Sequence, residues 1–120
     1  MCTFNGAAFV GEQLESLLRQ TRPPDELVVC DDCSSDGTTG IVAEFARRAP
    51  FHVRIVPHES NVGITANYEH AISLCSKDLV FLCDQDDIWH ADKVAASRKG
   101  AAVSPRNRAR RLDHPTSRVP

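Results

Sequence analysis

The segment DLVFLCDQDDIW, residues 78–89, places an apolar run directly before three carboxylates. The run LVFL (79–82) is continuous, as in a strand that is covered on both faces of a sheet. Asp84, Asp86 and Asp87 follow it closely, and like charges at such short spacing repel one another. A buried strand therefore ends in a cluster of charge that needs a compensating group, and a cation is the simplest one.

The chain before this segment alternates strand patterns with helix patterns. We predict the end of a strand at residues 2–6 and further strands at 27–30, 52–56 and 79–83. We predict helices at 9–20, with Phe9, Leu14 and Leu17 at helical spacing, and at 38–48 and 65–76. This alternation predicts an α/β fold with a largely parallel sheet flanked by helices.

Polar residues gather where the predicted strands end. Ligands of such sheets bind at the carboxyl ends of the strands, so these residues are expected to form a single site. They are Thr3, Asn5, Asp31, Asp32, Asn61, Asp84, Asp86 and Asp87.

Two interpretations of the acidic cluster remain open. Carboxylate oxygens suit Mg²⁺ or Mn²⁺, and these ions typically combine one or two carboxylates with substrate phosphates. Alternatively, Asp86 or Asp87 caps a helix that begins near Trp89. A cap uses one carboxylate of three, so a metal with a phosphate explains more of the pattern. In the 31–38 turn, we expect Asp36 or Thr38 to cap the following helix, and Asp32 to bind a ribose or a base.

The remaining sequence features exclude several classes of protein. No apolar run approaches the roughly 20 residues of a membrane span, and no signal peptide is evident, so we expect a cytoplasmic location. The five cysteines are expected to be free thiols. Cys30 and Cys33 form a C-x-x-C, but the two intervening carboxylates oppose a redox or zinc role. Neither a dinucleotide fingerprint nor a P-loop occurs.

Charge divides the chain in two. Residues 1–94 hold 7 Lys and Arg against 15 Asp and Glu, whereas residues 95–120 hold 7 against 1. We predict an acidic domain at 1–94 and a disordered basic tail at 95–120, which lacks an apolar period. Basic runs can bind nucleic acid or anionic lipid, but without aromatic residues or a known binding fold we expect no nucleic-acid partner.

Four motifs in order resemble the family 2 glycosyltransferases of the GT-A fold over residues 1 to about 94: TFNG (3–6), VVCDDCSSDGT (28–38), NVGITANY (61–68) and DLVFLCDQDDIW (78–89). CDQDDIW and NVGITANY resemble the rhamnosyltransferase-like branch, which acts on surface polysaccharides. The resemblance implies transfer of a sugar from a UDP- or dTDP-sugar to a saccharide or lipid-linked acceptor. It also implies a possible peripheral location at the inner face of the membrane.

The resemblance also implies roles for individual residues. Asp84 and Asp86 match a D-x-D motif and are both expected to bind Mg²⁺ or Mn²⁺, with Asp86 as the first choice for direct contact. Asp84 is also expected to bind the nucleotide-sugar. Asp32 would bind the N3–H of uracil or thymine, while Trp89 packs beneath the loop or faces the sugar. The other residues expected to bind the nucleotide-sugar are Thr3, Asn5, Asn61, Gly63 and Asn67.

The sequence departs from the family in three places. The first strand is short, which leaves part of the sheet interior unpaired, and the match fades after Lys93. The acceptor half and its general base are not found. Three hypotheses follow: a working glycosyltransferase, perhaps completed by a partner chain; a non-catalytic remnant that at most binds nucleotide; or an Asp-based phosphotransfer domain of the receiver or dehalogenase type. The dehalogenase pattern needs its D-x-D on the first strand, and the receiver pattern needs a later Lys at a strand end.

Overall fold

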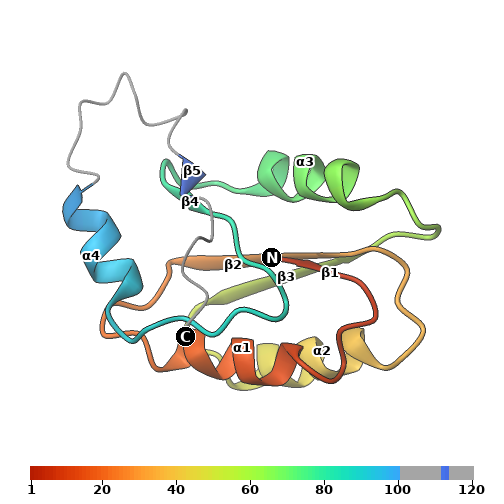
Figure 1. Ribbon diagram of the computed structural model, residues 1–120, viewed down its shortest axis with the longest axis horizontal. Coiled ribbons are helices and arrows are strands. Elements are labelled where there is room, and N and C mark those ends of the chain that lie inside the picture. Colours follow the sequence, from red (N-terminus) through yellow and green to blue (C-terminus); the bar gives the residue numbers. More distant parts are fainter. Residues whose placement is uncertain (101–111, 114–120) are drawn as a thin grey trace.

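The elements alternate along the chain as predicted. A computed structural model describes residues 1–100 and 112–113 (Figure 1). The strands are β1 (Cys2–Thr3), β2 (Glu26–Asp31), β3 (His52–Pro57), β4 (Val80–Phe81) and β5 (Leu112–Asp113). The helices are α1 (Val10–Leu18), α2 (Thr38–Arg48), α3 (Ile64–Leu74) and α4 (Lys93–Gly100).

A parallel sheet of three strands in the order β1-β2-β3 forms the centre of the fold. Helices α1 and α2 cover one face of this sheet and α3 covers the other (Figure 1). Neighbouring residues of β2 point to opposite faces: Val29 packs in the core with α1 and α2, while Val28 and Cys30 pack with Ala71 of α3. The predicted α/β architecture is therefore confirmed.

The strand predicted at 79–83 differs most from expectation. Strand β4 contains only Val80 and Phe81, and it pairs with β5 rather than with the central sheet. A single parallel bridge between Cys2 and Asp84 joins the acidic segment to β1. Because β1 has only two paired residues, it is too short for the 79–83 segment to form a longer ladder along it. The bridge still aligns Asp84 with the carboxyl end of β1.

An apolar cleft lies beside β1. On β2, the strand pairs with Cys30 and Asp31. Among the described residues, the N-terminal half of β2 has a strand neighbour on one side, β3. The cleft is lined by Met1, Leu27 and Val28 together with residues of α3 and the 79–83 segment. The sheet interior that we predicted to lack a strand partner lies here.

Helix α4 begins later in the chain than we predicted. It starts at Lys93 rather than near Trp89, so capping by Asp86 or Asp87 is wrong. The helix also extends through residues 95–100, the first part of the predicted disordered tail. Val94 is buried, and its amide donates to Gln20 Oε1 at 3.0 Å, which fixes α4 to the end of α1. The tail at 101–111 and 114–120 lies outside the described residues. In the described part of the chain, no helix is long and apolar enough to cross a membrane.

Candidate functional site

A cleft of about 460 Å³ opens at the carboxyl edge of the central sheet. Its lining unites the ends of β1 and β2, the loop before α3, the start of α3 and the acidic segment. Among the residues predicted for the site, Asn5, Asp31 and Asp87 do not contribute to this lining, and the others do. The lining residues are Cys2, Thr3, Phe4, Asp32, Asn61, Gly63, Ile64, Asn67, Tyr68, Asp84, Gln85 and Asp86.

Buried polar groups of α1 hold the acidic segment from both sides. Gln13 Nε2 donates to Cys83 Sγ at 2.7 Å, immediately before Asp84. Ser16 Oγ accepts from the Trp89 amide at 3.2 Å, just after the cluster. Trp89 is buried against Phe81, with ring centroids 5.8 Å apart, so it packs beneath the segment. The carboxylates are therefore presented from a loop whose two ends are fixed.

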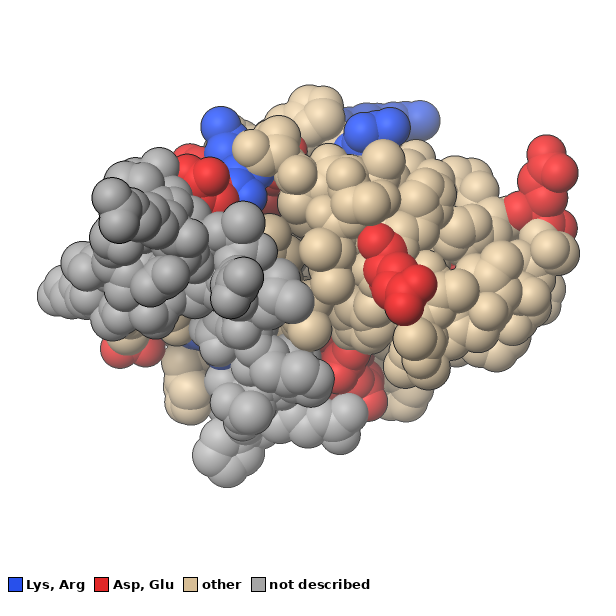
Figure 2. Space-filling view, turned by 90° about the horizontal axis from the view of Figure 1, so that it is seen from above, with Lys and Arg blue, Asp and Glu red and all other residues tan. Residues whose placement is uncertain are grey.

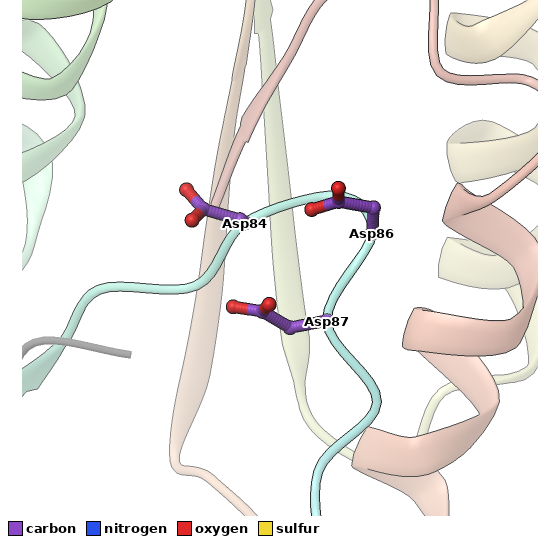
Figure 3. Close-up of side chains that lie close together, drawn as sticks. All are labelled: Asp84, Asp86 and Asp87. Carbon is purple, nitrogen blue, oxygen red and sulfur yellow. The ribbon is translucent and has the colours of Figure 1, made fainter. Parts of the chain in front are cut away.

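The three carboxylates of this loop lie close together and point to the same side (Figure 3). Asp84, Asp86 and Asp87 each offer an oxygen, and these oxygens all lie within 4.8 Å of one another. Asp86 is exposed and Asp84 half-buried, and both line the cleft, whereas Asp87 is fully buried. Oxygen donors at this separation fit a hard divalent cation such as Mg²⁺ or Mn²⁺. Asp84 and Asp86 lie at the open side of this cluster, and their predicted roles as metal ligands stay a prediction.

Asp84 receives a hydrogen bond that the sequence did not reveal. Tyr68 of α3 donates its hydroxyl to Asp84 Oδ1. Burial, together with this hydrogen bond, raises the pKa of Tyr68, so the phenol stays protonated and remains a donor. Tyr68 closes the NVGITANY motif, but the pattern alone does not show which carboxylate its hydroxyl reaches.

Gln85, between the two metal-binding candidates, ties their loop to the residues after β1. Its Oε1 accepts from the Phe4 amide at 2.9 Å, and its Nε2 donates to the Phe4 carbonyl at 3.0 Å. A Cβ on Gly6 would overlap Gln85 Oε1, so only glycine leaves room for this pairing. Neither Gln85 nor Phe4 was predicted as a site residue, although both line the cleft and the Phe4 ring is exposed.

Asp32 organises the loop before α3. Its Oδ1 accepts from the Val62 amide at 2.6 Å, and its Oδ2 accepts from the Gly63 amide at 3.0 Å. Asn61 Nδ2 also donates to the Asp32 carbonyl, at 3.4 Å. Gly63 has a φ of 89°, a conformation that favours glycine. The three residues predicted at this position therefore form one hydrogen-bonded unit, and the predicted contact of Asp32 with a base stays a prediction.

Thr3 and Asn67 line the cleft, but their polar groups bond within the protein. Thr3 Oγ1 donates to Asp31 Oδ1 at 2.6 Å. Asn67 Nδ2 donates to the Cys30 carbonyl at 3.0 Å, and its Oδ1 lies 2.9 Å from His58 Nε2. Both side chains are buried. They shape the cleft walls and hold β1 and α3 against β2.

Asn5 is a predicted site residue that lies away from the cleft. Its backbone amide donates to Ser34 Oγ at 2.8 Å, and its side-chain Oδ1 accepts from the Ser35 backbone amide at 2.9 Å. Asp36 acts in the same connection: it accepts from the amides of Thr38 and Ala7, and these bonds, with that of the Thr38 hydroxyl foremost, lower its pKa. The N-cap position of α2 is occupied by Gly37 without a side-chain cap bond, so the predicted cap by Asp36 or Thr38 is wrong, and Asp36 instead supports the turn before the helix.

Comparison with known proteins matches this geometry to a family. The family model described as glycosyl transferase family 2 matches residues 1–97. The dTDP-rhamnosyl transferase RfbG of Shigella flexneri is 34% identical over 98 residues, which cover 78% of this chain and 34% of that protein. The glucosyltransferase WfgD of Escherichia coli is 32% identical over 94 residues, with 78% and 36% coverage. The chain thus spans about a third of the length of these relatives.

Solved structures give the same result. TarS of S. aureus, solved in complex with UDP, superposes with a TM-score of 0.72 at 26% identity over 82% of this chain and 29% of that one. The mannosyltransferase PcManGT of Pyrobaculum calidifontis, in complex with GDP-Man and Mn²⁺, superposes with a TM-score of 0.75 at 27% identity, over 87% of this chain and 31% of that one. The family match over most of the chain and these superpositions show that the chain belongs to glycosyl transferase family 2 and has the GT-A fold.

Proposed function

We propose that this chain binds the nucleotide-sugar donor of a metal-assisted glycosyltransferase that builds a cell-surface polysaccharide. The observation that carries the proposal is the single cleft in which Asp84 and Asp86 face the loop held by Asp32. Carboxylates on one side suit a cation with a diphosphate, and the loop on the other side suits a nucleoside. Family membership removes the support for a phosphotransfer domain.

Asp84 and Asp86 are the proposed metal ligands. A Mg²⁺ or Mn²⁺ ion bound there supplies positive charge for the diphosphate that leaves when the sugar is transferred. The solved structure of PcManGT contains Mn²⁺ with GDP-Man, which supports this choice of ions. The fixed ends of the acidic loop favour binding, because the carboxylates need little reordering when the ion arrives.

The nucleoside is proposed to lie between the end of β1 and the loop at 61–63. Phe4 is 47% exposed and offers an aromatic ring on which a base can stack. Asp32, Asn61 and Gly63 supply the opposite wall. RfbG is described as a dTDP-rhamnosyl transferase and TarS was solved with UDP, so a UDP- or dTDP-sugar is the proposed donor.

The acceptor is proposed to be a saccharide or a lipid-linked saccharide. WfgD is described as acting on a diphosphoundecaprenol-linked GlcNAc, which supports the lipid-linked form. Transfer also needs a general base that deprotonates the acceptor hydroxyl. Among the described residues, the carboxylates that line the cleft are Asp32, Asp84 and Asp86, and all three already have proposed roles. We therefore propose donor binding, rather than transfer, as what this chain does alone.

Calorimetric titration with UDP, dTDP and GDP, each with and without Mn²⁺, tests the proposal. We expect UDP or dTDP to bind, and the affinity to rise when Mn²⁺ is present. Equal affinity for all three nucleotides with no effect of Mn²⁺ would contradict both the base recognition and the metal site. Incubation of the chain with a radiolabelled UDP-sugar and a saccharide acceptor should give no transfer, and product formation would show that a base is present.

A further inference from the structure

We infer that Tyr68 is a positioning residue of the metal site: its hydroxyl fixes the Asp84 carboxylate so that one oxygen faces the cation. The inference rests on the proposed function, because it concerns the orientation of a proposed metal ligand. It assigns to Tyr68 a role that the D-x-D motif does not contain.

The hydrogen bond makes the two carboxylate oxygens of Asp84 inequivalent. Tyr68 Oη donates to Oδ1, so Oδ2 is the oxygen that remains for a cation. A carboxylate that is held in this way is expected to bind a metal through one oxygen rather than two. Outer-shell partners of this kind orient ligands and typically raise metal affinity 10–100-fold.

The Tyr68 ring is itself fixed in place. It is half-buried and packs against the cluster formed by Cys2, Val28, Cys30 and Ala71, at the face of the sheet that α3 covers. A ring held by β1, β2 and its own helix has little rotational freedom, so its hydroxyl marks a defined position. The backbone of Asp84 is fixed independently by its bridge to Cys2.

Helix α3 is anchored next to Tyr68 by a buried polar group. Asn67 Nδ2 donates to the Cys30 carbonyl, and Asn67 Oδ1 is hydrogen-bonded with His58 Nε2. This anchor holds the first turns of α3 at a constant position relative to the end of β2. The same helix follows the loop that Asp32 holds, so Tyr68 connects the nucleoside side of the cleft with its metal side.

The first test compares Mn²⁺ binding by the wild type, Tyr68→Phe and Ser73→Ala. Tyr68→Phe keeps the ring and removes only the hydroxyl. Ser73→Ala removes a hydroxyl from the same helix at an exposed position, where Ser73 Oγ donates to the His70 carbonyl, and serves as the matched control. Electron paramagnetic resonance of free Mn²⁺ measures affinity without turnover. We expect Tyr68→Phe to weaken Mn²⁺ binding about 10-fold or more and Ser73→Ala to leave it unchanged.

A double-mutant cycle separates positioning from a general loss of structure. If Tyr68 acts through Asp84, then Tyr68→Phe has no additional effect in an Asp84→Asn background. We expect Tyr68→Phe to lower the affinity for UDP without metal much less than it lowers the affinity for Mn²⁺. Additive losses from the two substitutions, or an equal loss of metal-free UDP binding, would overturn the inference.

A measurement on the unsubstituted residue covers the case in which Tyr68→Phe fails to fold. The chain has a single tyrosine, so labelling with 3-fluorotyrosine gives one ¹⁹F signal that reports on Tyr68 alone. Titration with Mg²⁺ in the presence of UDP is expected to shift this signal in step with metal binding. Metal binding without a shift would overturn the inference and leave the proposed function intact. Absence of any metal binding by the wild type would overturn both.

Discussion

Asp86 and Asp36 show how two carboxylates of the same loop-rich edge differ in role. Asp86 lines the cleft and belongs to the cluster of three carboxylates, whereas Asp36 accepts from the amides of Ala7 and Thr38. We expect Asp86→Ala to abolish metal-dependent nucleotide binding, because it removes a ligand from the open side of the site. We expect Asp36→Ala to keep this binding and to lower stability slightly, as the loss of a helix-start contact does. Calorimetry and thermal melting measure the two effects, and equal effects from the two substitutions would contradict the site assignment.

The cysteines provide a second test at the level of single residues. All five are free; Cys33 is exposed, whereas Cys2, Cys30 and Cys83 are buried. Burial raises the pKa of Cys2 to about 12 and that of Cys83 to about 11, so few of these thiols ionise at neutral pH. We expect iodoacetamide to modify Cys33 first at pH 8, as read by peptide mass spectrometry. Rapid modification of Cys83 would show that the segment before the acidic cluster opens readily.

For single residues, the sequence predicted which side chains line the cleft better than it predicted their hydrogen-bond partners. The spacing of Asp84 and Asp86 placed both in the cleft, since each follows a strand that ends at the sheet edge. Asn5 follows a strand equally closely, yet it bonds to the 34–35 turn instead. The roles of Tyr68 and Gln85 were not predicted. Their hydrogen bonds to Asp84 and Phe4 form only because the fold brings α3, the acidic loop and the end of β1 together.

The loop after β1 is the element on which the cleft depends most. It is held on one side by the 34–38 turn, through the Gly6 amide and Thr38 Oγ1 at 2.9 Å, and on the other by Gln85. We expect Gly6→Ala to displace Gln85, because the new Cβ would occupy the space of the amide group. Nucleotide affinity should then fall more than stability does.

Gly11→Ala is the matched control for this substitution. A Cβ at Gly11 meets nothing within 4 Å, and this residue lies inside α1, where alanine is favoured over glycine by about 1 kcal/mol. We expect Gly11→Ala to raise the melting temperature and to leave nucleotide binding unchanged. A Gly6→Ala chain that binds nucleotide as well as the Gly11→Ala chain would contradict the importance of the Gln85 pairing.

Elements with their own periodic pattern were predicted well, and elements defined by pairing were not. The helices α1, α2 and α3 follow apolar spacing, although Phe9 stays exposed and α1 begins at Val10. Strand β4 is shorter than its apolar run, because β1 limits the pairing available. The start of α4 was not predicted, because the hydrogen bond that fixes it, between Val94 and Gln20 just after α1, joins residues far apart in the sequence.

On the molecule as a whole, the close clustering of carboxylates is a local feature of the acidic loop. Seen from above, on the side of α3, Asp and Glu lie at separate places, and one group of them adjoins Lys and Arg (Figure 2). The three carboxylates of residues 84–87 instead lie within one coordination distance of each other. Such an arrangement costs free energy in the absence of a cation, and binding a cation stabilises it.

The stability of the whole chain should therefore depend on its ligands. Anything that binds only the folded state stabilises it, by about 2.7 kcal/mol at a concentration 100 times the dissociation constant. For a domain of this size, that corresponds to a rise in melting temperature on the order of 10 °C. We expect UDP with Mn²⁺ to raise the melting temperature more than either does alone. A non-cooperative melt that neither component changes would indicate that the chain does not form the cleft by itself.

The central claim is that one cleft holds a divalent cation at Asp84 and Asp86 together with a nucleotide at the loop that Asp32 holds. Mn²⁺ broadens the amide signals of residues close to it, so ¹⁵N-labelled chain titrated with substoichiometric Mn²⁺ and saturating UDP reports the position of the ion. We predict that broadening is strongest at residues 84–87 and extends to Tyr68 and Gly63. Broadening that is centred elsewhere, or that is uniform across the described residues, would contradict the account.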